Sequence, residues 1–221
     1  MNKKVSLAVA VAALLSACGG GGGGDGSPPP PDLTFNLDAA FANTLTQGIS
    51  FPNLRASYNG VSFQLSISST PTSDGVFLSQ TYHRAIESST VAINGQAGPV
   101  VSATLYFTLS PVTLVGGMDD AGLTIFTPQA SLPTAAHVGS SGPYTRADTY
   151  VSESNRTLLG QTVMSWSLEP DTATTAWACL VYSGMDGFQF EKDCYRIDAA
   201  GTIFNAKATM NLTDGTRLTF E

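Results

Sequence analysis

The sequence is poor in charge, and poorest in positive charge. Charged residues make up 12% of the chain, with 10 Lys and Arg against 17 Asp and Glu and a net charge of −7. The basic residues form no cluster, and two of them, Lys3 and Lys4, lie in the leader described below. A chain this acidic repels nucleic acid and anionic lipid headgroups. We therefore expect no nucleic-acid partner.

Histidine and cysteine are also scarce, which limits the chemistry open to the chain. The sequence has 2 His and 3 Cys, and its histidines, His83 and His137, form no local pair at metal-ligand spacing. Acidic residues that could offer oxygen ligands to calcium are Asp119, Asp120, Asp186, Glu191 and Asp193. They do not follow the spaced pattern of a calcium-binding loop, and turns favour Asp for backbone reasons. We expect no metal and no cofactor.

The longest apolar run lies near the start of the chain and is too short to span a membrane. It covers residues 5–17 and follows Lys3 and Lys4. As a helix it would be about 20 Å long, against about 30 Å for the hydrocarbon layer. Positive charge ahead of a short apolar run is typical of an export signal. The sequence therefore predicts a signal peptide over residues 1–17.

The apolar run ends on Leu15-Ser16-Ala17-Cys18, a branched residue and two small residues before a cysteine. This tetrapeptide resembles the lipobox of bacterial lipoproteins. The resemblance implies cleavage before Cys18 and attachment of acyl chains to that residue, and two or more chains anchor a protein stably in a membrane. In that family an Asp after the cysteine favours inner-membrane retention, whereas Gly19 stands here, so we expect the outer membrane. The alternative is an ordinary secretory signal.

A low-complexity spacer follows the cysteine. Residues 19–24 are all Gly and residues 28–31 are all Pro. The Gly-rich part has an expected reach of about 16 Å, and the prolines add about 12 Å of stiffer chain. The spacer is similar to those of transferrin-binding and heparin-binding surface lipoproteins, whose lobes are β-barrels, and the likeness covers the spacer alone. We expect a lipidated Cys and Gly/Pro-rich linker over 18–31 and a folded domain over 32–221.

The hydrophobic pattern after the spacer has a period of two, as in a half-buried strand. Alternation over residues 33–41 predicts a first strand, and the sequence predicts no amphipathic helix. We expect an all-β domain, an antiparallel β-barrel or β-sandwich. Two similar half-sheets are possible, because the pattern of residues 61–67 is echoed by 162–168 and that of 103–109 by 206–212.

Turn residues predict the register of two hairpins. Asn59-Gly60 is typical of a two-residue hairpin turn, and Thr213-Asp214-Gly215 of a three-residue loop with a bulge at the glycine. The predicted cross-strand pairs are Leu54 with Leu65, Met210 with Leu218 and Ala208 with Phe220. In each pair the apolar side chains fall on one face of the sheet.

The two remaining cysteines, Cys179 and Cys194, form an even pair in a chain predicted to be exported, where thiols oxidise. If Asp186-Gly187 is a two-residue turn, the two cysteines lie directly opposite each other. That register makes them a hydrogen-bonded pair with Cα atoms about 5.5 Å apart. We predict a structural disulfide, and the alternatives are buried free thiols or a redox-active pair.

One candidate catalytic site combines the long loop over residues 128–143 with Asp148, and paired carboxylates for glycoside cleavage also stay open, because their separation is set only in three dimensions. Ser140 or Ser141 with His137 and Asp148 would supply a nucleophile, a base and an orienting acid. The loop lacks the Gly-x-Ser-x-Gly elbow of a serine hydrolase, and closeness in sequence does not establish the geometry. A solvated loop rich in small residues is the simpler interpretation. Whether the chain is an enzyme stays open, with the balance against it.

Taken together, these features predict a cell-envelope lipoprotein that acts as a non-catalytic binding or scaffold module. Its expected partners are the membrane, through acyl chains on Cys18, and an envelope protein or a small-molecule ligand, because tyrosines and tryptophans could line a groove. The alternative is an envelope hydrolase acting on ester or carbohydrate substrates. An integral outer-membrane barrel is disfavoured, because strands such as 61–67 are shorter than the roughly 9 to 11 residues that a membrane-spanning strand needs. The sequence leaves open whether the protein faces the periplasm or the exterior.

Overall fold

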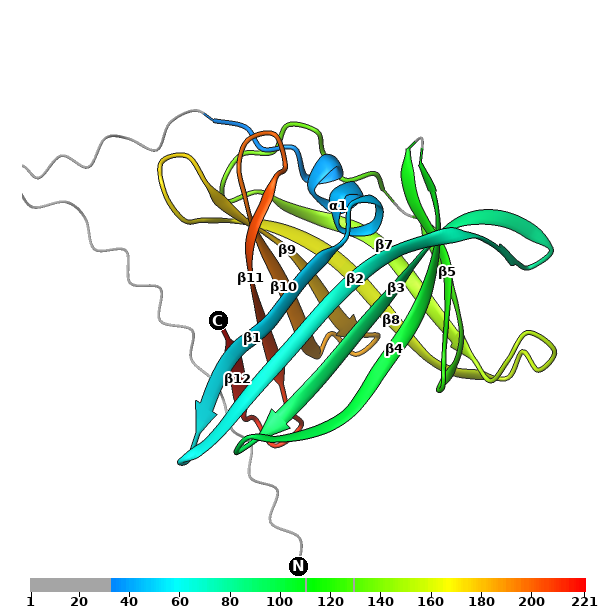
Figure 1. Cartoon of the computed structure of the whole chain (residues 1–221). Coiled ribbons are helices and arrows are strands. Elements are labelled where there is room, and N and C mark those ends of the chain that lie inside the picture. Colours follow the sequence, from blue (N-terminus) through cyan, green and yellow to red (C-terminus); the bar gives the residue numbers. More distant parts are fainter. Residues whose placement is uncertain (1–32, 110, 129) are drawn as a thin grey trace, which may run out of the picture.

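In the computed structural model, twelve strands form one antiparallel sheet in which each strand pairs with the next along the chain (Figure 1). The structure describes residues 33–109, 111–128 and 130–221, so the predicted signal peptide, Cys18 and the predicted linker lie outside the described residues. The elements are α1 (Leu37–Thr46), β1 (Ile49–Tyr58), β2 (Val61–Phe77), β3 (Gln80–Ile93), β4 (Gln96–Leu109), β5 (Val112–Asp119), β6 (Gly122–Pro128), β7 (Ser141–Tyr150), β8 (Leu158–Pro170), β9 (Ala176–Gly184), β10 (Gln189–Ile197), β11 (Ile203–Asn211) and β12 (Arg217–Phe220). The predicted all-β class is confirmed. Among the described residues no helix is both long and apolar enough to cross a membrane.

The sheet curls until its last strand meets its first, so that it is nearly closed into a barrel. The Arg55 backbone N–H donates to the Glu221 carbonyl over 2.9 Å, and the Glu221 N–H donates to the Arg55 carbonyl over 3.1 Å. These bonds join the end of β12 to β1 and decide for a barrel over a sandwich. The sheet is continuous and shows no division into half-sheets. Two echoed segments lie on β2 and β8, but the others lie on β4 and β11, which breaks a six-strand repeat.

Alternation along the strands separates the side chains of the barrel interior from those of the exterior. Leu65, Phe107 and Leu168 are buried inside the barrel, at 1%, 2% and 1% exposure. On the opposite face, Ser88 and Ser102 face each other across β3 and β4, with their hydroxyl oxygens 2.8 Å apart. Because successive side chains of a strand point to opposite faces, the period of two seen in the sequence is the pattern that this barrel requires.

Several strands are longer than the sequence pattern indicates. β2 has 17 residues and β3 has 14, so the expectation that segments such as 61–67 are too short for a membrane span was wrong. β2 continues through a Pro-, Asp- and Gly-containing stretch because a bulge between Thr72 and Gly75 absorbs the irregularity. The turn after it uses Leu78 and Ser79 at φ of 49° and 67°, a conformation that L residues rarely adopt.

Residues 33–41 do not form the predicted strand. Phe35 makes a single bridge to Ala136, and the chain then enters α1, which lies across one end of the barrel (Figure 1). The Asn36 side chain caps the helix by accepting from the Ala39 N–H over 2.9 Å. The apolar positions fit a helix as well as a strand, because the buried Leu37 and Leu45 lie on one helical face.

The β10–β11 turn holds the start of α1 in place. Gly201 has a φ of 87°, and a Cβ there would come within 2.7 Å of the Asn36 carbonyl oxygen. This close approach lets the Asn43 side chain donate to the Gly201 carbonyl over 3.0 Å, while the Asn36 N–H donates to the Ala199 carbonyl over 3.1 Å. The helix is thereby tied to the rim of the barrel.

Both predicted hairpin registers are confirmed. Leu54 lies opposite Leu65, Met210 opposite Leu218, and Ala208 opposite Phe220. Asn59 and Gly60 take φ values of 49° and 78°, as the two-residue turn requires. In the second loop the Leu212 N–H donates to the Thr216 carbonyl over 2.8 Å, which closes the three-residue connection.

The predicted disulfide joins Cys179 and Cys194, which lie directly opposite each other on β9 and β10. Their Cα atoms are 4.0 Å apart, closer than the expected 5.5 Å and near the spacing of about 4.5 Å in a non-hydrogen-bonded pair. The turn differs from the predicted one, because the Gly184 N–H donates to the Phe188 carbonyl over 2.9 Å. A bulge between Gln189 and Glu191 then restores the register at the cysteines.

Replacing both cysteines by serine is expected to lower the free energy of unfolding by about 3 kcal/mol, because the crosslink restricts the unfolded chain. Urea unfolding of oxidised wild type and of the Cys179→Ser/Cys194→Ser variant measures the difference. Reduced wild type is the control and should unfold with the variant. Equal stability of the oxidised and reduced proteins would contradict a stabilising role for the bond.

Candidate ligand-binding cavity

The interior of the barrel contains two adjoining cavities. The first, of about 260 Å³, lies between the β1–β4 wall and the β9–β11 wall. The second, of about 210 Å³, extends toward β5–β8 and to Phe41 of α1. Glu87, Tyr182 and Tyr195 line both cavities. These three side chains therefore lie where the two spaces meet.

Three carboxyl groups face the first cavity from opposite walls. Glu87 comes from β3, while Glu191 and Asp193 come from β10, two residues apart and so on the same face of that strand. Neither cavity has a Lys, Arg or His side chain in its lining. Within residues 33–221, apart from 110 and 129, no hydrogen bond or ion pair reaches the carboxyl oxygens of these three residues. These carboxyl groups therefore have no counterion in the described part of the chain.

Burial without a counterion disfavours the charged form of each acid. It raises the pKa of Glu87 to about 7, and the nearby Glu191 carboxylate adds to the shift. Burial raises the pKa of Asp193 well above its usual value, with further contributions from Glu191 and Glu87. The pKa of Glu191 is also raised by burial. The interior therefore favours either bound protons or a cation.

Two phenols complete the polar part of the first cavity. Burial, and then the nearby acids, raise the pKa of both Tyr182 and Tyr195 well above the usual value. Both phenols are therefore protonated at neutral pH. Their rings present a negative face that attracts cations, and their hydroxyl groups can donate or accept a hydrogen bond.

Ser69 adds an unsatisfied hydroxyl group to the wall of this cavity. It lies directly opposite Glu87 in the β2–β3 pair, so both side chains lie on the same face of the sheet. Ser69 is 3% exposed and lines the cavity, yet its hydroxyl has no hydrogen-bond partner among the described residues. A buried hydroxyl group without a partner costs about 1–3 kcal/mol, so it favours a ligand that can bond to it.

The residues predicted for catalysis lie outside the barrel interior. His137 is exposed on the loop between β6 and β7, and its carbonyl accepts from the Ser140 N–H over 3.0 Å. Ser141 is exposed at the start of β7. The loop crosses the same end of the barrel as α1, to which it is joined through Phe35. His137 and the two serines therefore do lie in one stretch of rim.

The predicted acid of the triad does not join them. Asp148 lies seven residues along β7 from Ser141, a separation of about 23 Å in a strand. Its carboxylate accepts hydrogen bonds from the Gln161 side chain over 2.9 Å and from Arg146 over 3.2 Å. The structure thus places Asp148 in a polar network of its own and does not bring it to the serines.

The acidic residues singled out in the sequence divide into two kinds. Asp119 and Asp186 close turns, since their carboxylates accept from the Gly122 N–H over 2.9 Å and from the Phe188 N–H over 3.0 Å. Glu191 and Asp193 of the cavity are separate from Asp186. The aromatic residues divide likewise: Tyr182 and Tyr195 line the cavity, whereas Trp177 contacts Lys207, with the ammonium 4.3 Å from the ring centroid.

Sequence reasoning missed Glu87 and Ser69. The alternation of β3 places Glu87 on the inner face, together with Ala85 and Ser89. Ser69 follows from its pairing with Glu87. The position of Glu87 on the inner face becomes visible only with the bounds of β3, Gln80–Ile93.

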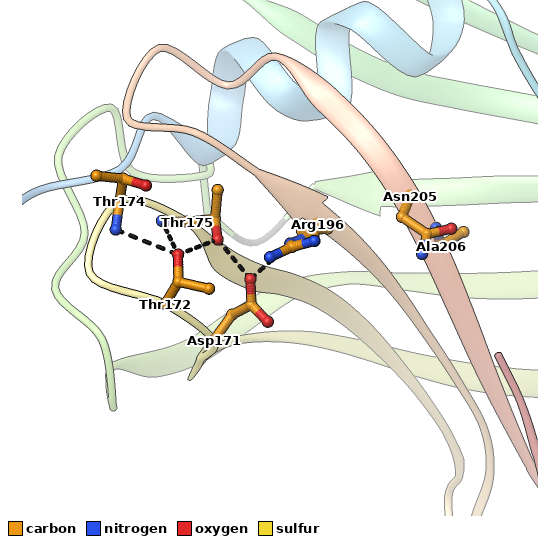
Figure 2. Close-up of polar contacts among 7 residues, drawn as sticks. All are labelled: Asp171, Thr172, Thr174, Thr175, Arg196, Asn205 and Ala206. Carbon is orange, nitrogen blue, oxygen red and sulfur yellow. Dashed lines mark hydrogen bonds and ion pairs between the residues drawn. The ribbon is translucent and has the colours of Figure 1, made fainter.

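Other polar clusters of the described residues have structural roles. At the β8–β9 turn, the Asp171 carboxylate accepts from Thr175 and from Arg196, the latter over 2.6 Å, as Figure 2 shows. Burial alone would raise the pKa of Asp171, but these hydrogen bonds hold it below its usual value. Glu169 lies near the two disulfide sulfurs. Because those sulfurs are bonded to each other, they are not thiolate ligands for a metal.

Comparison with protein-family models, with curated proteins and with solved structures finds no match to this chain. The fold and the cavity alone define its class, which is a twelve-stranded antiparallel meander, nearly closed into a barrel and hollow enough inside to hold a small molecule.

Proposed function

We propose that the protein is a lipid-anchored component of the cell envelope whose barrel binds a small ligand in its interior without transforming it. The observation that carries this proposal is the polar cavity of about 260 Å³ with its unpaired carboxyl groups. Ligand sites are typically cavities of about 300–1,000 Å³ that combine apolar walls with a few convergent polar groups. The two adjoining cavities together fall in this range.

The sequence at the start of the chain supports the anchor. Leu15-Ser16-Ala17-Cys18 resembles a lipobox, and the spacer after it would let the barrel stand off from the lipid. The outer face of the barrel carries the hydroxyl groups of Ser88 and Ser102 and the polar pair of Gln161 with Asp148, together with exposed apolar side chains such as Ile86 and Val100. The proposal that the barrel lies beside the membrane therefore rests on the acyl anchor and the spacer. The outer membrane is the proposed location, on either its periplasmic or its external face.

Cys18→Ser is expected to prevent attachment of the acyl chains. About 90% of the protein should then be lost from the outer-membrane fraction, because two or more chains supply the stable anchoring. Fractionation of a bacterial host with quantitative blotting measures the distribution, and mass spectrometry of the N-terminal peptide measures the modification. Ser27→Ala, in the same spacer, is the matched control and should fractionate as wild type does.

Two results would overturn the proposal. An unmodified Cys18 thiol on soluble wild-type protein would remove the anchor. Reproducible turnover of an ester or a glycoside, abolished by His137→Ala, would replace the binding module by a hydrolase.

A further inference from the structure

The interior of the barrel contains acceptor groups that have no partner of opposite charge among the described residues. Glu87 faces the first cavity from one wall, and Glu191 and Asp193 face it from the other. Ser69 adds a buried hydroxyl group beside Glu87. We infer that this cavity binds an elongated organic cation with two or more amine groups, that is, an aliphatic polyamine. This inference rests on the proposed function and assigns the class of its ligand.

The spacing of the acids favours an extended ligand over a single metal ion. Among the described residues, the one set of three potential metal ligands whose donor atoms lie within 4.8 Å of one another is Glu169 with the two disulfide cysteines. The carboxyl groups of Glu87, Glu191 and Asp193 are therefore too far apart to converge on one small cation. A chain with separate ammonium groups reaches them one at a time.

The remaining wall of the cavity suits the methylene groups of such a chain. Leu65, Ile67 and Met210 line the same cavity as the acids. Burying methylene groups against these side chains is worth about 0.8 kcal/mol each. An inorganic cation would gain nothing from this surface, so the combination of acids and apolar walls is specific for an alkylamine.

The phenols and the serine fit the ammonium groups. The rings of Tyr182 and Tyr195 can attract a cation through their faces, and the Ser69 hydroxyl can accept one ammonium N–H. Charge-assisted hydrogen bonds to the three carboxylates would then replace the protons that burial otherwise favours. Binding is therefore coupled to proton release at a pH where the acids are partly protonated.

Isothermal titration calorimetry of the full lipidated protein in neutral detergent, with spermidine as the probe at pH 7.5, tests this inference. Spermidine is expected to bind, with protons released to the buffer, and 1,8-octanediol, an uncharged chain of the same length, is not. Asp193→Asn and Glu87→Gln should each weaken spermidine binding about 10-fold or more, since each removes one buried charge pair. Glu153→Gln changes an exposed loop acid and should leave the affinity unchanged.

The outcomes separate this inference from the proposed function. If 1,8-octanediol binds as tightly as spermidine, the cavity takes small molecules without regard to charge, so the binding function stands and the ligand class is wrong. If Glu153→Gln weakens spermidine binding as much as Asp193→Asn does, the amine binds to the acidic surface and the inference is overturned. If neither compound binds, and native mass spectrometry of protein from its own host finds no bound small molecule, both proposals fail.

Discussion

Phe220→Ala is expected to lower the free energy of unfolding by about 3–5 kcal/mol, the usual cost of truncating a fully buried aromatic side chain. Phe220 is 0% exposed and lies on β12, which has only four residues. It packs in a cluster with Leu54 of β1, Leu65 of β2 and Leu218 of β12. The side chain therefore holds the closing strand against β1, and urea unfolding should show the loss directly.

Thr219→Ala is the matched control for this prediction. Thr219 precedes Phe220 on the opposite face of β12, and its hydroxyl lies 3.5 Å from that of Thr209. We expect a loss of about 1 kcal/mol or less, since one hydrogen bond contributes about that much. If Phe220→Ala cost no more than Thr219→Ala, β12 would not close the barrel in solution.

The parts of this fold that could be predicted from sequence are those set by short-range geometry. Asn59-Gly60 fixes its hairpin because few residues take positive φ values, and the register follows by counting from the turn. The disulfide between Cys179 and Cys194 was predicted in the same way. The predicted pairing of the cysteines is correct although the predicted turn is not, because the bulge before Glu191 restores the register.

The first helix could not be predicted because its apolar positions satisfy two periods at once. Residues 33, 35, 37, 39 and 41 alternate as a strand requires, and Leu37 and Phe41 are also spaced as a helix requires. In the structure the Asn36 side chain caps the helix. Tertiary bonds to Ala199 and to the loop around Ala136 support it, and no local pattern reveals them.

The cavity could not be predicted because its walls are distant in sequence. Glu87 on β3 meets Glu191 and Asp193 on β10 only once the sheet has curled, and periodicity along a strand carries no information on curvature. The sequence did mark Glu191 and Asp193, in one group with Asp186, as possible oxygen ligands. It could not show that their partner lies across the barrel, nor that Ser69 is left without a hydrogen bond.

Acidification is expected to stabilise this protein between pH 8 and pH 5, with a rise in Tm of about 5–10 °C. The Glu87 carboxyl has an ordinary pKa of 4.5, which the fold raises to about 7. The folded state thus binds this proton more tightly than the unfolded state does. The resulting destabilisation grows as the pH rises from about 4.5 to about 7 and reaches about 3 kcal/mol above that window. At about 2–4 °C per kcal/mol for a chain of this length, the shift in Tm follows.

The neighbouring groups act in the same direction. Asp193 and Glu191 also have a raised pKa, and the phenols of Tyr182 and Tyr195 stay neutral throughout this range. No Lys, Arg or His side chain in the lining of either cavity offsets these acids. The opposite dependence, from the lowered pKa values of Asp171 and Asp214, falls below this window. The interior acids therefore dominate between pH 5 and pH 8.

Differential scanning calorimetry across this range, on wild type and Glu87→Gln, isolates the contribution of Glu87. The glutamine cannot ionise, so we expect the variant to be more stable than wild type at pH 8 and nearly equal to it at pH 5. The difference in Tm between the variant and wild type at pH 8 should be smaller when spermidine is present. A bound cation stabilises the Glu87 carboxylate of wild type, whereas the variant has no carboxylate at this position. A wild-type Tm that rises from pH 5 to pH 8, or a Glu87→Gln variant with the same pH profile as wild type, would show that Glu87 is not buried without a counterion.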